Sequence, residues 1–234
     1  MAHEIQNFTF QNPTKILFGR NRIEDIDNEI PKDAKVLVLY GGGSVKKNGA
    51  FDRAVKALGD REWDEFSGIE ANPTFETLMK AVEKVRAGNF TYLLAIGGGS
   101  VIDGTKFVSA ASLFTEDPVD LFGWGVGKGL PVQEVVPFGT ILTLPATGSE
   151  MNSGAVITLV EKKAKVSFRG SKTFPVFSVL EPELTYTLPV RQLVNGLLDT
   201  YIHVMENYLT YPVGALLQDR YAESILQTLI EIAP

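Results

Sequence analysis

Apolar residues in the first half of the chain form short continuous runs that alternate with segments of helical period. The runs are Lys35–Tyr40 (KVLVLY), Trp63–Ile69 and Thr91–Ile96 (TYLLAI). The helical patterns that follow them cover Val45–Leu58, Phe75–Ala87 and Val101–Phe114. Continuous apolar strands that alternate with helices indicate a parallel sheet covered on both faces. We therefore predict an α/β fold with a doubly wound parallel sheet.

The pattern changes after Asp117-Pro118 and again near Leu188. Strand-like segments cover Phe138–Glu150, Gly154–Val160, Lys163–Phe168 and Phe174–Pro182. From Leu188 the chain is helical, over Pro189–Thr210 and Val213–Ile232, with a break at Pro212. We predict an α/β domain over residues 1–187 and the first helices of an all-α domain over residues 188–234.

The N-terminal segment predicts two short strands, Phe8–Phe10 and Lys15–Phe18, around an Asn12-Pro13 turn. They can form a local hairpin that covers the sheet. As edge strands, they can equally pair with a second copy across a two-fold axis. The pattern alone does not decide between the two arrangements.

Composition and charge exclude several function classes. The formal net charge of -6 disfavours binding to nucleic acid, which needs clustered Lys and Arg. The apolar runs are too short to span a bilayer, and the first residues lack the pattern of a signal peptide. The absence of cysteine excludes disulfides, thiolate nucleophiles and Cys-based metal sites. A cytoplasmic protein is the simplest expectation.

Two glycine-rich loops follow predicted strands and precede predicted helices. They are Gly41-Gly42-Gly43-Ser44 and Gly97-Gly98-Gly99-Ser100. Glycine lets backbone N–H groups approach a ligand closely, and a helix N-terminus favours a phosphate. One such loop is more often a tight turn, but two at the carboxyl edge of one sheet favour a nucleotide with several phosphates.

The first loop also bears on which nucleotide binds. It contains no acid to bind an adenine ribose 2′-hydroxyl, and Lys46 and Lys47 follow it. This favours NADP(H) over NAD(H). The alternative is that both lysines are simply solvated on the first turn of a helix.

Asp199 and His203 lie four residues apart in a predicted helix and share one face. They lie opposite an apolar stripe, whose members are Val190, Val194, Leu197, Leu198, Tyr201, Met205 and Tyr208. The polar face can be solvated surface with a weak Asp–His pair. It can also be the wall of a cleft, where a carboxylate and an imidazole chelate a divalent metal.

Four segments together resemble the iron-containing (group III) alcohol dehydrogenases, most closely their NADPH-dependent aldehyde reductase and butanol dehydrogenase branch. The segments are YGGGSVKKNG, LLAIGGGSVIDGTKF, LTLPATGSEMN and NGLLDTYIHVMENYLT. The resemblance implies a Rossmann-like N-terminal domain that binds a dinucleotide, and an all-helical C-terminal domain that supplies most of a metal site. It also implies a homodimer, formed through the N-terminal strands.

The family's cofactor motifs match particular residues of this chain. The resemblance places Gly42, Gly43 and Ser44 near the adenine ribose, and Asn72 toward the adenine end. It places Gly98, Gly99, Ser100 and Asp103 at the pyrophosphate and nicotinamide side. Further matches are Thr143, Thr147 and Ser149 in a threonine-rich loop, and Lys165 as a cofactor-side lysine. Asp199 and His203 match the first two metal ligands.

The implied reaction is reversible hydride transfer between the nicotinamide and an aldehyde or primary alcohol, with a divalent metal (Fe²⁺ or Zn²⁺) as Lewis acid. Family members bind their metal through one Asp and three His, but this chain has no histidine after His203. We expect half a metal site, as in a truncated chain, a fragment or a protein completed by another polypeptide. No residue stands out as a proton donor. The alternatives are a non-catalytic dinucleotide-binding module and an enzyme similar to glycerol dehydrogenase or dehydroquinate synthase.

Overall fold

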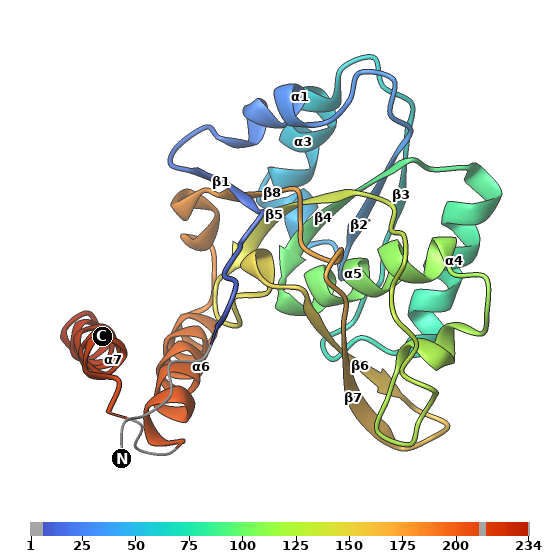
Figure 1. The fold of residues 1–234 in the computed structure, drawn as a ribbon. Coiled ribbons are helices and arrows are strands. Elements are labelled where there is room, and N and C mark those ends of the chain that lie inside the picture. Colours follow the sequence, from blue (N-terminus) through green and yellow to red (C-terminus); the bar gives the residue numbers. More distant parts are fainter. Residues whose placement is uncertain (1–6, 211–213, 234) are drawn as a thin grey trace.

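The computed structural model, which describes residues 7–210 and 214–233, contains a six-stranded parallel sheet (Figure 1). The strand order is β1-β8-β5-β4-β2-β3. The bounds are β1 Lys15–Phe18, β2 Val36–Tyr40, β3 Trp63–Phe66, β4 Tyr92–Gly98, β5 Phe138–Leu144 and β8 Phe177–Leu180. The predicted α/β fold with a doubly wound parallel sheet is confirmed.

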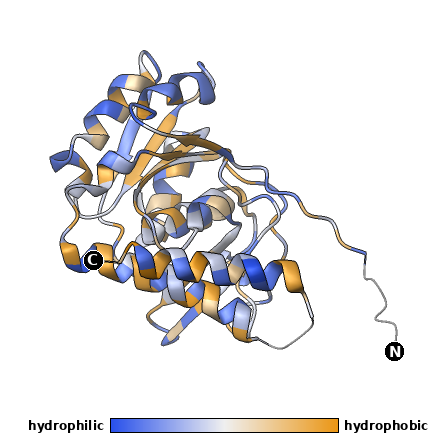
Figure 2. Ribbon diagram, turned by 90° about the vertical axis from the view of Figure 1, so that its left-hand side faces the viewer, coloured by the Kyte–Doolittle hydropathy of each residue, from blue (hydrophilic) through white to orange (hydrophobic). Residues whose placement is uncertain are grey.

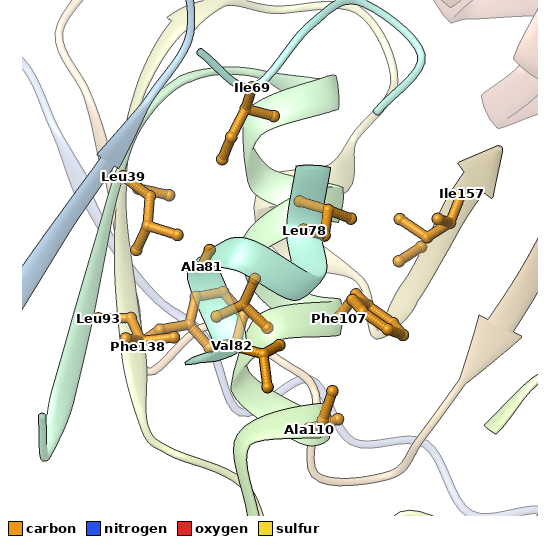
Figure 3. Close-up of a cluster of buried hydrophobic side chains, with 14 of the residues drawn as sticks. Leu39, Ile69, Leu78, Ala81, Val82, Leu93, Phe107, Ala110, Phe138 and Ile157 are labelled. Atoms are coloured by element: carbon orange, nitrogen blue, oxygen red, sulfur yellow. The ribbon is translucent and has the colours of Figure 1, made fainter. Parts of the chain in front are cut away.

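Helices cover both faces of this sheet. One layer contains α1 (Ile26–Glu29), α2 (Ser44–Lys47) and α3 (Ala50–Leu58), and the other contains α4 (Phe75–Gly88) and α5 (Gly99–Leu113). Successive residues of a strand point to opposite faces. Accordingly, Val36 and Val38 of β2 pack in the first layer, and Leu37 and Leu39 pack in the second. Figure 3 shows Leu39 and Leu93 meeting side chains of α4 and α5 in that second core.

Helix α5 is buried at nearly every position from Val101 to Ser112. A helix that is buried all round must be covered by the protein on all sides. Its outer side is covered by an antiparallel hairpin of β6 (Gly154–Leu159) and β7 (Ala164–Arg169), which Figure 1 shows projecting below the sheet. Phe168 of β7 packs edge-on against Phe107 of α5. The hairpin is thereby fixed beside the helix N-terminus.

Two predicted elements near the N-terminus differ from the structure. Residues 7–14 contain no strand, so the prediction of a strand over Phe8–Phe10 is wrong, and both phenylalanines are exposed. Strand β1 pairs in parallel with β8, which excludes the local hairpin. The side chain of Asn12 accepts a hydrogen bond from Thr14 N and donates one to Met151 O, which directs the chain into the sheet edge.

The predicted helix Val45–Leu58 is interrupted. It divides into α2 and α3 at Asn48-Gly49, where Gly49 has φ 81. The Asn48 side chain accepts a hydrogen bond from Ala50 N at 3.1 Å and so supports the start of the second helix. The apolar periodicity continues across this break, which is why the sequence pattern did not reveal it.

The C-terminal segment forms α6 (Val190–Leu209) and α7 (Leu216–Glu231), as predicted. The predicted break at Pro212 lies outside the described residues. Helix α6 meets the α/β part at Gly196, where a Cβ would lie 2.7 Å from Pro145 O, and at Thr200, which bonds Ala146 O. Within the described residues, no helix is long and apolar enough to cross a membrane.

Much of the apolar stripe predicted on α6 is exposed. Val190 is 69% exposed and Leu198 is 54% exposed, and on α7 Leu216 is 70% exposed. Figure 2 shows these two helices side by side, with hydrophobic and hydrophilic residues alternating along both. The side of α6 that contacts the α/β part is therefore the one that carries Gly196, Thr200 and their neighbours.

Candidate functional site

The two glycine loops meet at the point where the strand order reverses. The chain passes from β2 to β3 on one side of β2, and it returns to β4 on the other side. In open α/β sheets, ligands bind outside the carboxyl ends of the strands at such a switch point. Gly41–Ser44 follows β2 and Gly97–Ser100 follows β4, so the fold brings together the two loops that the sequence singled out.

The second loop leaves no room for side chains. Strand β4 continues through Gly98, and α5 begins at Gly99. A Cβ at Gly99 would lie 2.5 Å from Thr147 Oγ1 and 3.4 Å from Ser149 Oγ. The hydroxyls of Thr147 and Ser149 lie 2.8 Å apart. The predicted threonine-rich loop therefore lies directly against the start of α5.

A cleft of about 560 Å³ opens beside this helix N-terminus, and we call it the central cleft. The predicted residues that line it are Asn72, Gly99, Ser100, Asp103, Thr147, Ser149, Lys165, Asp199 and His203. Residues that were not predicted also line it: Pro73, Asn152, Gly154, Ala155, Val156, Ser167, Phe168 and Arg169. Most of the predicted site residues thus line one cavity. Thr143 is buried on β5 and does not line it.

Lys165 links three elements at one end of the central cleft. Its Nζ donates to Asn72 Oδ1 at 2.8 Å, which ties β7 to the loop before α4. Asn72 has φ 57, in the left-handed region that Asn tolerates, and its backbone N donates to Ser100 Oγ at 3.4 Å. The predicted residues Asn72, Ser100 and Lys165 therefore form one connected group.

A buried charge pair supports the wall of the cleft. Lys106 is fully buried, and its Nζ donates to Asn152 Oδ1 at 2.8 Å and to Gly154 O at 2.7 Å. Asp103 Oδ1 lies 3.6 Å from this ammonium, and Asp103 Oδ2 accepts from Val156 N. Burial lowers the pKa of Lys106 to about 8 and raises the pKa of Asp103.

Lys106 and Asn152 were absent from the predicted site. Lys106 occurs in the quoted segment GGGSVIDGTKF, so a signal for it was present. Nothing in sequence spacing shows that its ammonium reaches Asn152, which is 46 positions away. This contact depends on how the hairpin folds back over α5.

Asp199 and His203 face the central cleft from α6. Asp199 Oδ2 and His203 Nε2 lie 3.7 Å apart, with side chains 45% and 53% exposed. Both side chains line the central cleft although each is about half exposed. Within residues 7–210 and 214–233, no group of three His, Cys, Asp or Glu side chains could hold a metal ion. The described residues therefore offer two donors.

The first glycine loop lies outside the central cleft. A Cβ at Gly42 would meet nothing within 4 Å, Gly43 has φ 90, and Ser44 begins α2. Lys46 is not simply solvated, because its Nζ lies 2.7 Å from Glu65 Oε2. The same ammonium lies over the Tyr40 ring. Glu65, on β3, thus neutralises a charge that the local sequence left unpaired.

Comparisons of the sequence with known proteins agree on one family. The sequence model of the iron-containing alcohol dehydrogenases matches residues 13–182. The chain is 50% identical over 98% of its length to the NADPH-dependent aldehyde reductase YqhD of Escherichia coli K12. It is 42% identical over 98% of its length to a probable NADH-dependent butanol dehydrogenase 1 of Bacillus subtilis. It spans 59% of the length of each.

Solved structures agree with this result. The NADH-dependent butanol dehydrogenase A of Thermotoga maritima matches with a TM-score of 0.91 at 37% identity, over 98% of this chain and 57% of that chain. The structure of Escherichia coli YqhD also matches with a TM-score of 0.91, at 50% identity, over 96% of this chain and 57% of that chain. On its sequence, its fold and its glycine loops, this chain belongs to the iron-containing alcohol dehydrogenase family.

Proposed function

We propose that this chain contributes the dinucleotide-binding cleft of an NADP(H)-linked, metal-dependent alcohol dehydrogenase that acts on aldehydes and primary alcohols. One observation carries the proposal. The N-terminus of α5, at Gly99 and Ser100, lines the same cleft that Asp199 and His203 face. A phosphate-binding end and a pair of metal-ligand types thus share one cavity.

The residues around α5 fit a dinucleotide. Free N–H groups in the first turn of α5 favour a phosphate, and this turn lines the cleft at Gly99 and Ser100. The hydroxyls of Thr147 and Ser149 and the ammonium of Lys165 would hold and orient it. When bound, the nicotinamide supplies the hydride chemistry.

Preference for NADP(H) rests on the first glycine loop. Gly41–Ser44 contains no acid that would repel a 2′-phosphate. Lys46 contributes less than its charge suggests, because Glu65 pairs with it. The relatives differ on this point: YqhD is named as NADPH-dependent, and the butanol dehydrogenases are named as NADH-dependent. The acid-free loop therefore decides our choice of NADP(H).

We propose that Asp199 and His203 supply two ligands of a divalent metal, Fe²⁺ or Zn²⁺. An Asp oxygen and a His nitrogen on one helix face suit either ion, and further ligands would come from outside the described residues. A bound metal supplies Lewis-acid polarisation of a carbonyl. A second candidate, a dinucleotide-binding module without catalysis, is favoured by the presence of only two donors in the described part of the chain.

We also propose a homodimer formed through β1. Among the described residues this strand pairs with β8 alone, so its other edge is open there, and Phe18 is 67% exposed. Open strand edges invite pairing with another chain. Phe18→Lys should convert a dimer to a monomer in analytical ultracentrifugation. A wild-type monomer would contradict this part of the proposal.

Titration with NADPH and then NADH tests the cofactor assignment. We expect NADPH to bind more tightly than NADH, and we expect Zn²⁺ not to change either affinity. Lys165→Met should weaken NADPH binding by about tenfold, as expected for the loss of one charge-assisted contact. A folded chain that binds neither nucleotide would contradict the proposed function.

A further inference from the structure

Strand β7 presents a row of polar side chains to the central cleft. Lys165, Ser167 and Arg169 are exposed and line the cleft, whereas Phe168 between them is buried in the core. Alternation along a strand puts the three on one face. The cleft therefore has two cationic side chains on its hairpin wall, and no sequence motif singled out Arg169.

Arg169 differs from the other charged residues of the cleft in having no partner. Lys165 is held by Asn72, Asp103 lies beside Lys106, and Asp199 pairs with His203. Within the described residues, the guanidinium of Arg169 takes part in no hydrogen bond or ion pair. An unpaired guanidinium on a cleft wall is ready to bind an anionic group.

The residue opposite Arg169 holds its side chain against the cleft wall. Arg169 pairs across the hairpin with Gly154, and a Cβ on Gly154 would lie 3.8 Å from Arg169 Nε and 3.7 Å from Asn152 Oδ1. The Arg169 side chain therefore passes over Gly154, beside Asn152. The Gly154 carbonyl is itself anchored by buried Lys106. The Gly154 side of the pocket is therefore rigid.

Lys165 and Arg169 are too far apart to bind the same anionic group. Four residues along a strand span about 13 Å. Lys165 lies with Asn72 and Ser100 at the start of α5, where the proposed pyrophosphate binds. Arg169 lies at the other end of β7, beside Gly154. Lys165 and Arg169 would therefore each bind a different anionic group.

We propose that Arg169 is a specificity-determining residue that binds a carboxylate on the substrate, so that the enzyme prefers aldehydes and alcohols carrying an acid group. A guanidinium binds a carboxylate through two parallel N–H···O bonds, which fix its orientation as well as its charge. This inference rests on the proposed function, because it takes the substrate to lie in the central cleft beside the cofactor.

Two alcohols that differ only in the acid group test this. The chain is first saturated with NADPH, and 4-hydroxybutyrate and 1-butanol are then titrated separately by ligand-observed NMR. Using alcohols with the reduced cofactor allows no turnover. We expect 4-hydroxybutyrate to bind at least about tenfold more tightly, a preference that one charge-assisted bidentate contact can supply.

Three variants test whether Arg169 causes this preference for the alcohol with the acid group. Arg169→Met should abolish it, Arg169→Lys should retain part of it, and Lys172→Met, which removes the same charge from an exposed position outside the cleft, should leave it intact. NADPH affinity should be the same in all of them. Equal affinity of the wild type for both alcohols, or a preference that survives in Arg169→Met, would overturn the inference.

Different results would overturn the proposed function and the inference about Arg169. If Arg169→Met weakens NADPH binding by about tenfold without changing the preference between the alcohols, Arg169 is a cofactor contact and the inference is overturned. If the wild type binds NADPH but neither alcohol, the inference alone is overturned. If the folded wild type does not bind NADPH, the proposed function is overturned, and this inference with it.

Discussion

Gly42 and Gly99 are both glycines at strand-to-helix turns, but the structure gives them different reasons to lack a side chain. At Gly99 a Cβ would collide with Thr147, so the constraint comes from the protein itself. At Gly42 a Cβ meets nothing within 4 Å, so any constraint must come from a ligand. A substitution at Gly99 should therefore affect folding, whereas a substitution at Gly42 should affect ligand binding.

Gly42→Ala should leave the free energy of unfolding within about 0.5 kcal/mol of wild type but weaken NADPH binding, because the new Cβ would face the ligand. The measurements are urea denaturation and NADPH titration. Gly123→Ala, where a Cβ makes only an ordinary contact at 3.9 Å, is the control and should change neither. Unchanged NADPH affinity in Gly42→Ala would remove Gly42 from the cofactor site.

The lowered pKa of Lys106 predicts how the free energy of unfolding depends on pH. Burial lowers its pKa from 10.5 to about 8, so between these values the unfolded chain binds more protons than the folded chain. The contribution of Lys106 to the free energy of unfolding should therefore rise with pH across this window, by at most about 1.4 kcal/mol per pH unit.

Urea denaturation of the wild type and Lys106→Met between pH 7 and 10.5 measures this contribution as the difference between the two. The difference should increase toward high pH. A difference that stays constant would show that the two hydrogen bonds that the ammonium donates to Asn152 Oδ1 and Gly154 O keep it protonated throughout. In that event the lowered pKa would be wrong.

At the residue scale, the sequence predicted the residues that local motifs mark. Gly99, Ser100 and Asp103 follow one predicted strand. Asp199 and His203 lie four residues apart on one predicted helix. In both groups, local spacing alone predicts that the residues lie near one another. Asn152 stands at the end of the quoted segment LTLPATGSEMN, so a signal for it was present. Arg169 could not be predicted, because it reaches the cleft only through the hairpin. The pairing of Lys46 with Glu65 was missed because it depends on how β3 pairs beside β2.

Helix α4 begins with a side-chain cap that also adjoins the cleft. Thr74 Oγ1 accepts from Thr77 N at 3.3 Å and lies 2.5 Å from Glu70 Oε1. Thr74→Ala should lower the free energy of unfolding by about 1 kcal/mol, the usual cost of losing an N-cap. Thr74→Ser should retain most of the stability in the same urea denaturation. Equal losses in both variants would show that the methyl group matters rather than the cap.

At the element scale, the strands and the long helices were predictable, and their interruptions were not. Continuous apolar runs mark β2 and β4 because both faces of a parallel strand are buried. The division between α2 and α3 depends on the left-handed conformation of Gly49, which leaves no trace in the apolar period. Phe8 and Phe10 alternate like strand residues, but no neighbouring strand pairs with them in the structure.

The whole molecule has an unequal distribution of apolar surface. The sheet and its two helical layers enclose well-buried cores, whereas α6 and α7 expose large side chains such as Ile202 and Leu216. Exposed apolar patches of this kind mark interaction surfaces or promote association. The relatives are longer than this chain, which spans 59% of the length of both YqhD and the Bacillus subtilis butanol dehydrogenase 1.

Ile202→Gln should therefore reduce self-association and binding of a hydrophobic dye, with little change in the melting temperature. Ile202 is 53% exposed, so little buried area is lost. Leu226→Gln, at a position only 9% exposed, is the matched contrast and should lower the melting temperature. Light scattering, dye fluorescence and thermal unfolding measure the three quantities. Equal destabilisation by both variants would show that Ile202 is covered in solution.

Hydrogen–deuterium exchange of the chain with and without NADPH tests the central claim most directly. The first-turn amides of α5, Gly99–Val101, lack helical acceptors and should exchange rapidly in the free chain. A phosphate bound there would accept their hydrogen bonds, so NADPH should slow exchange in this turn and in Thr147–Ser149. Binding of NADPH without protection of the α5 N-terminus would contradict our placement of the cofactor in the central cleft.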